Sequence, residues 1–210
     1  IHSRKTNVQT TLDNVSILEK LWVETNSYNI YENYYFLKSW YLELTGNYKG
    51  VVDFTWDAEK KVRKGKINPL RFDERYNVYM RTFSYLCMKD YKKGLESAEI
   101  GRKLIEKTTR NWFAHMENYF LLAMHSRDYN KAADIYKLVN NNTNIKKVSS
   151  DAAERWKLMK AYLNFAIPEK KIIKRLTFSD FYNSMEYYNK DKKGYNISLI
   201  ILEFIHMLNK

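Results

Sequence analysis

A seven-residue motif recurs three times along the chain, at residues 46–52, 89–95 and 127–133. Each copy runs through a short turn, an Asn or Asp, a Tyr, a polar residue, a Lys or Gly, and a small residue. The three tyrosines are 43 and 38 residues apart, which is the length of one helical hairpin with its connection. A recurrence at this distance predicts a repeat protein built from pairs of helices.

The motif predicts the start of a helix. Asn47, Asp90 and Asp128 can each accept hydrogen bonds from the free backbone amides of the first helical turn. We expect the tyrosine that follows to lay its ring back over the preceding helix. A small residue three positions after the tyrosine would let two helices approach closely. These residues are Val51, Gly94 and Ala132.

Apolar residues flank each turn at the helical spacing of three and four. The row before each turn is expected to face the core, and it comprises Ile30, Tyr34, Leu37, Tyr41 and Leu44, then Phe72, Tyr76, Tyr79, Phe83 and Leu86, then Trp112, Met116, Phe120 and Ala123. The row after each turn comprises Val51, Ala58 and Val62, then Leu95, Ala98 and Ile105, then Ala132, Tyr136 and Val139. Helices joined by two or three residues must lie antiparallel, so both rows supply a shared core.

Turn and rows together resemble the tetratricopeptide repeat, over about residues 28–141. In that family a Gly-Asp/Asn-Tyr-x-x-Ala turn joins the two helices of each repeat. Only Gly46 matches the glycine, because Lys89 and Arg127 stand at its place in the other copies. The resemblance implies binding of a peptide or protein on a concave face, without catalysis.

We therefore predict an all-α fold of antiparallel helix-hairpin repeats, stacked as a right-handed, tetratricopeptide-like α-solenoid of ten or eleven helices in one domain spanning residues 1–210. The expected parts are an N-terminal capping helix in 1–27, hairpins at 28–66, 71–108 and 110–141, and divergent C-terminal helices in 150–210. Within the last part we expect a helix over 151–167, a short partner at 169–176, and a hairpin over 178–210. The final helix of that hairpin is apolar, so we expect it to be covered on more than one side, either by its neighbours or by an absent segment or partner. Because residue 1 is Ile, we expect this chain to be part of a longer one.

Composition and motifs argue against several other classes. Two prolines and six glycines leave few positions closed to helix. The single cysteine, Cys87, is expected to fill core space and fits a reducing, cytoplasmic location. The longest apolar stretch, 197–208, is too short to span a bilayer. The four histidines include no metal-binding pair, and phosphate-binding loops and nucleophile motifs are missing. We predict a protein that is not an enzyme and has no cofactor or metal.

Tyrosines beside the apolar row of the first hairpin, such as Tyr28, Tyr31 and Tyr35, are candidates for lining a groove. Polar or aromatic positions of successive first helices line the groove in the tetratricopeptide family, so the resemblance implies a peptide or protein site there. The candidate residues are Tyr31, Tyr35, Lys38, Asn77, Arg81, Asn118 and Tyr119.

The charge of the chain supports an alternative. Its formal net charge is +12, and an amphipathic basic face at Lys170, Lys171, Lys174 and Arg175 would suit phosphate groups. The second reading is therefore a basic, nucleic-acid-associated or regulatory helical module. A third reading, an enzyme with a dispersed site, would require a deep polar pocket with convergent titratable groups.

Overall fold

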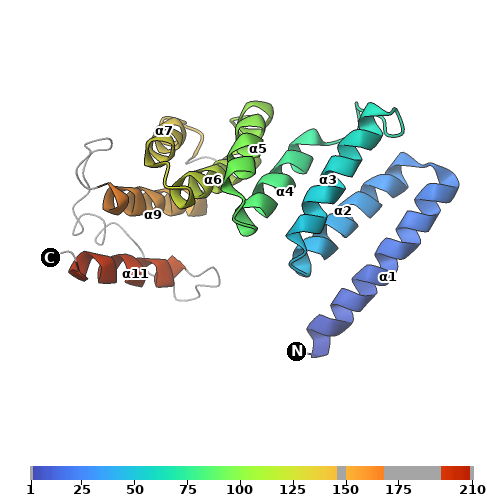
Figure 1. Ribbon diagram of the computed structural model, residues 1–210, viewed down its shortest axis with the longest axis horizontal. Helices are drawn as coiled ribbons and strands as arrows, with labels where there is room; N and C mark the ends of the chain where they lie inside the picture. The colour runs from blue at the N-terminus through green and yellow to red at the C-terminus, as the bar shows by residue number, and fades with distance from the viewer. Residues whose placement is uncertain (1, 146–149, 168–194, 209–210) are drawn as a thin grey trace. The chain divides into compact units, whose positions relative to one another are not determined.

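A computed structural model describes residues 2–145, 150–167 and 195–208. Within these ranges all regular structure is α-helical and no strand occurs (Figure 1). The helices are α1 (His2–Thr25), α2 (Tyr28–Leu44), α3 (Tyr48–Arg63), α4 (Glu74–Cys87), α5 (Tyr91–Leu104), α6 (Arg110–His125), α7 (Tyr129–Asn140), α9 (Ser150–Ala166) and α11 (Tyr195–Leu208). The chain divides into two compact units, Ile1–Gly101 and Arg102–Lys210, and each is described by itself.

The three predicted helix starts are confirmed. The side chain of Asn47 accepts from the backbone N–H of Gly50 at 2.9 Å, and Asp128 accepts from the N–H of Lys131 at 3.1 Å. Asp90 accepts in the same way from Lys93 at 3.4 Å. The antiparallel pairs α2–α3, α4–α5 and α6–α7 therefore begin and end close to the positions that the recurring motif predicted.

Each cap also closes the helix before it. The N–H groups of Asn47, Asp90 and Asp128 donate to carbonyls five residues earlier, at 2.8, 3.0 and 2.9 Å. The residue just ahead of each cap has a left-handed backbone, with φ of 71° at Gly46, 61° at Lys89 and 62° at Arg127. This is the Schellman arrangement, which satisfies the last carbonyls of a helix. One connection of three residues thus ends one helix and starts the next.

The core of the first unit is aromatic. Tyr31, Tyr34 and Tyr35 of α2 are buried against Phe54 of α3 and Val15 of α1. The ring of Tyr35 stacks on Phe54 at 5.3 Å, and Tyr34 meets it edge-on at 5.7 Å. The prediction that Tyr31 and Tyr35 lie beside the core is wrong. Helix α2 packs against both α1 and α3, so more of its circumference is buried than one row of apolar residues.

Helix α4 is packed the opposite way from the prediction. Asn77, Arg81, Thr82 and Ser84 are buried, whereas the expected core residues Tyr76, Tyr79 and Phe83 are only partly buried. Two of these polar side chains bond to neighbouring helices: Thr82 hydrogen-bonds Ser97 of α5 at 2.9 Å, and Asn77 donates to the Thr55 carbonyl of α3 at 3.2 Å. The aromatic row of α4 is left at the surface of the unit.

The second unit follows the prediction more closely. Trp112, Met116, Phe120 and Ala123 of α6 are buried as expected, as are Ala132, Tyr136 and Val139 of α7. Helix α9 packs on both: Trp156 meets the ring of Phe120 at 5.6 Å and that of Tyr136 at 6.4 Å. As predicted, α9 ends before Pro168. The helices expected at 169–176 and within 178–194 lie outside the described residues.

Helix α11 is covered on one side. Its Leu199 and Leu202 are buried with Ala161 of α9, and the Tyr162 hydroxyl of α9 donates to the Ser198 carbonyl at 3.1 Å. The helix is not wedged under its neighbours in the described residues, since its outer apolar side chains are exposed. These are Ile197, Ile200, Ile201, Phe204, Met207 and Leu208. Cover by an absent segment or a partner stays a prediction.

Candidate binding surface

The residues proposed to line a groove are mostly interior in the structure. Six of the seven are buried: Tyr31, Tyr35, Asn77, Arg81, Asn118 and Tyr119. Lys38 is partly buried. These six side chains pack between helices, and Tyr31 and Tyr35 also line a small hollow. The proposed basic face at Lys170, Lys171, Lys174 and Arg175 lies outside the described residues.

Three of these residues meet in one polar network between α2, α3 and α4. The Tyr35 hydroxyl donates to Oδ1 of Asn77, and Nδ2 of Asn77 donates to Glu59 Oε1 at 2.8 Å. The Arg81 guanidinium donates to the same carboxylate oxygen at 2.7 Å. The guanidinium also lies over the ring of Trp56, 3.8 Å from its centroid. Burial raises the pKa of the Tyr35 hydroxyl well above its usual value of 10.0, so it stays a donor.

A second network fastens α1 to α2. Nζ of Lys38 donates to the Tyr34 hydroxyl at 2.7 Å, and that hydroxyl donates to Oε1 of Glu19 at 2.6 Å. Lys38 also lies 3.5 Å from Glu19 and 5.1 Å from the centroid of the Phe54 ring. Burial, with the hydrogen bond to Glu19 next, raises the pKa of Tyr34 far above 10.0. Lys38 is therefore occupied within the unit.

Six aromatic side chains of the first unit are exposed or partly exposed, and we call this set the aromatic face: Phe36 and Trp40 of α2, Tyr48 of α3, and Tyr76, Tyr79 and Phe83 of α4. Trp40 is 49% exposed and Phe36 39%, and the other four are partly exposed. Phe36 meets Tyr76 at 4.8 Å, and Tyr48 meets Phe83 at 6.0 Å, both edge-on. The latter contact joins two successive hairpins, an arrangement that we did not predict.

The Glu43 side chain lies at one end of the aromatic face. Burial first, and the nearby Glu43 carboxylate second, raise the pKa of Tyr76 to about 12. The pKa of Tyr48 is raised chiefly by the hydrogen bond between its hydroxyl and the thiol of Cys87, and Glu43 adds a smaller contribution. The pKa of that partly buried thiol is raised chiefly by burial, so the sulfur is held as the weakly reactive thiol.

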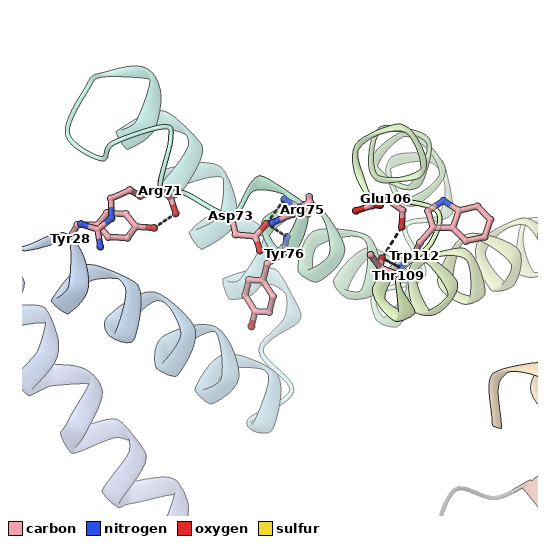
Figure 2. A network of polar contacts seen from close by, with 8 residues as sticks. All are labelled: Tyr28, Arg71, Asp73, Arg75, Tyr76, Glu106, Thr109 and Trp112. Carbon is pink, nitrogen blue, oxygen red and sulfur yellow. Dashed lines mark hydrogen bonds and ion pairs between the residues drawn. The ribbon is translucent and has the colours of Figure 1, made fainter. Parts of the chain in front are cut away.

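A small hollow lies at the other end of the aromatic face. It is lined by Tyr28, Tyr31, Glu32, Tyr35, Phe36, Phe72 and Asp73. Figure 2 shows two contacts at its rim: the Tyr28 hydroxyl donates to the Arg71 carbonyl, and Asp73 caps α4 by accepting from the N–H of Arg75 at 3.0 Å. The guanidinium of Arg71 lies 4.1 Å from the centroid of the Tyr28 ring. These contacts hold the loop between α3 and α4 against the N-terminus of α2.

In the second unit, Asn118 and Tyr119 do not form a comparable surface. Nζ of Lys131 lies 5.9 Å from the centroid of the buried Tyr119 ring. The nearby Arg155 of α9 forms a two-pronged ion pair with Glu117 of α6, at 2.9 and 3.0 Å. Figure 2 also shows Thr109, which caps α6 by accepting from the N–H of Trp112 at 3.3 Å. These contacts fasten helices of this unit.

The prediction from sequence missed Phe36, Trp40 and Glu43. A signal was present, because Glu32, Phe36, Trp40 and Glu43 follow one another at steps of four, four and three and so share one side of α2. We followed only the apolar row of this helix that continues into the turn.

Across the described ranges, no cluster of three or more histidine, cysteine or acidic side chains is arranged to hold a metal ion. Likewise, none of the helices in those ranges has both the length and the apolar character needed to cross a bilayer. No family model, no curated protein and no solved structure matches this chain.

Proposed function

We propose that this chain is a non-enzymatic scaffold or adaptor: a tetratricopeptide-like stack of helical hairpins that binds a segment of another protein on its aromatic face. The observation that carries the proposal is the exposure of Trp40 and Phe36 on helices that are otherwise firmly packed. Tryptophan and tyrosine are the side chains that contribute most often to binding energy in protein interfaces.

The frame beneath the aromatic face supports this proposal. The ring of Tyr76 is positioned by α4, and α4 is tied to α3 through Asn77, Arg81 and Glu59. A surface held in this way loses little conformational freedom when a partner binds, which favours affinity. Covering the exposed part of Trp40 would remove roughly 100 Å² of apolar surface from water, which stabilises a complex by about 2–3 kcal/mol.

Selection from a library of random peptides displayed on phage tests the proposal. The expected result is enrichment of a related set of peptides, with affinities that fall by about tenfold or more in Trp40→Ala and Phe36→Ala. The matched control is Phe204→Ala, which removes a more exposed phenylalanine, at 61%, in the other unit. Circular dichroism would verify that the variants are folded.

Failure to enrich any peptide family would refute the proposal. So would enriched peptides that bind both aromatic-face variants as tightly as the original protein, because their site would then lie elsewhere.

A further inference from the structure

The outer side of α2 carries two aromatic side chains between two acidic ones. Glu32, Phe36, Trp40 and Glu43 lie in one row along it. Eleven residues separate the two carboxylates along the helix, which corresponds to about 16 Å at the rise of an α-helix. The aromatic rings lie between the acids.

Neither carboxylate of this row has an ion-pair partner among the described residues, although nearby carboxylates do. Glu19 is paired with Lys38, Asp57 with Lys61 at 2.5 Å, and Glu59 with Arg81. The only basic residue within α2 is Lys38, and its ammonium group is engaged by Tyr34 and Glu19 on the inner side of the helix. The row therefore carries negative charge that no residue of α2 neutralises.

The aromatic rings beside Glu43 strengthen the attraction of this row for positively charged groups. The face of an aromatic ring attracts cations, and a carboxylate at its edge strengthens the attraction. The hollow at Glu32 is the weaker of the two positions, because the guanidinium of Arg71 already lies over Tyr28 there and donates to Asn29. A cation is better accommodated next to Glu43, because Trp40 lies three residues earlier on the same side of α2 and the Glu43 carboxylate is close enough to Tyr76 to act on its hydroxyl.

We propose that the aromatic face binds an extended peptide segment with two basic side chains, one paired with Glu43 beside Trp40 and the other directed toward Glu32. This inference rests on the proposed function and specifies the chemistry of the partner. An extended chain advances about 3.3 Å per residue, so the two basic residues would be roughly four to six positions apart. Apolar side chains between them would cover Phe36 and Trp40.

The charge of the whole chain makes this preference specific. With a formal net charge of +12, the protein attracts acidic molecules and repels basic ones at long range. Binding of a basic segment would therefore depend on local contacts with this row. A general electrostatic attraction would favour acidic peptides instead.

Two defined phage libraries test the inference. Both keep randomised positions, but one fixes Lys or Arg at two positions five residues apart, and the other fixes Asp or Glu there. Each is selected against the original full chain and against Glu43→Gln, Trp40→Ala and Glu24→Gln. The last is the matched control, since Glu24 is an exposed acid of the same unit on α1.

Enrichment of the basic library is expected, with affinities about threefold to tenfold lower in Glu43→Gln and unchanged in Glu24→Gln. Enrichment of the acidic library, or basic peptides that bind Glu43→Gln normally, would overturn this inference. In both cases, weaker binding of the enriched peptides to Trp40→Ala would still uphold the proposed function. Enrichment of neither library would overturn the inference, and the random library then decides the proposed function separately.

Discussion

Replacing Arg81 with methionine perturbs the network that holds α4 on α3. The Arg81 side chain is 3% exposed, and its partner Glu59 is 19% exposed. Methionine keeps the aliphatic packing over Trp56 but removes the charge. The change strands a largely buried carboxylate, and breaking a buried ion pair in this way costs about 3–5 kcal/mol. Because Glu59 keeps the hydrogen bond from Asn77 and some contact with water, we expect a loss of about 3 kcal/mol.

A double-mutant cycle separates the pair from the rest of the packing. Glu59→Gln removes the negative charge, and the Arg81→Met/Glu59→Gln double variant removes both charges. We expect the double variant to be less destabilised than the sum of the single variants by about 2 kcal/mol, since neither charge is then left alone. The exposed pair Lys49–Asp53, with side chains 77% and 62% exposed, serves as the control, and Lys49→Met should cost less than about 0.5 kcal/mol.

The assay is urea denaturation followed by far-ultraviolet circular dichroism. Because the chain has two compact units, each unit can give its own unfolding transition. The Arg81 variants should shift only the unfolding transition of the first unit. The reasoning is refuted if Arg81→Met costs less than 1 kcal/mol, or if the single-variant losses simply add. Either result would mean that this network does not hold α4 in place.

Three further predictions follow from the structure. Lys89→Gly and Arg127→Gly should each stabilise the fold by about 0.5 kcal/mol. A left-handed backbone costs an L-residue about 1 kcal/mol, and part of the stability gained by removing this cost is lost because glycine makes the unfolded chain more flexible. Urea midpoints measure the change, and lower midpoints for both variants would contradict the prediction. The pKa of Tyr76 is raised from 10.0 to about 12 in the folded protein. The unfolded chain therefore loses the hydroxyl proton at a lower pH than the folded one, and the free energy of unfolding falls as pH rises from 10 to 12. Tyr76→Phe should lessen that fall in melting curves recorded at alkaline pH, and an unchanged fall would argue against the prediction. Leu163→Ala removes a fully buried side chain of α9 and should cost about 3 kcal/mol in urea denaturation, whereas a cost below 1 kcal/mol would place Leu163 outside the core.

The limits of the helices were predictable because their signals are local. Asn47, Asp90 and Asp128 bond to amides three residues away and to carbonyls five residues away, so a short stretch of sequence contains both partners. The bonds also explain why Lys89 and Arg127 can replace the glycine of the first turn. The backbone geometry is imposed by the cap, and the cost of an L-residue there is about 1 kcal/mol.

The side of a helix that is buried was harder to predict. On α4 the buried residues Asn77 and Arg81 are satisfied by Tyr35 and Glu59, which lie 42 and 18 to 22 residues away in the sequence. Hydrophobicity at helical spacing gives no sign of such partners. It therefore assigns the aromatic row to the core and the polar row to the groove, whereas the structure buries the polar row and leaves the aromatic row partly buried.

The contrast between α4 and α6 shows why this reversal bears on function. Both helices were predicted to bury an aromatic row, and α6 does so with Trp112 and Phe120. On α4 the buried side holds the polar network together with Val78, Met80 and Tyr85. Phe83 and Tyr76, which meets the ring of Phe36, are left partly exposed. An apolar interior would have tolerated many substitutions of similar volume, whereas a satisfied polar network accepts few. The proposed binding function therefore depends on the polar network that holds α4 in place beneath its partly exposed aromatic row.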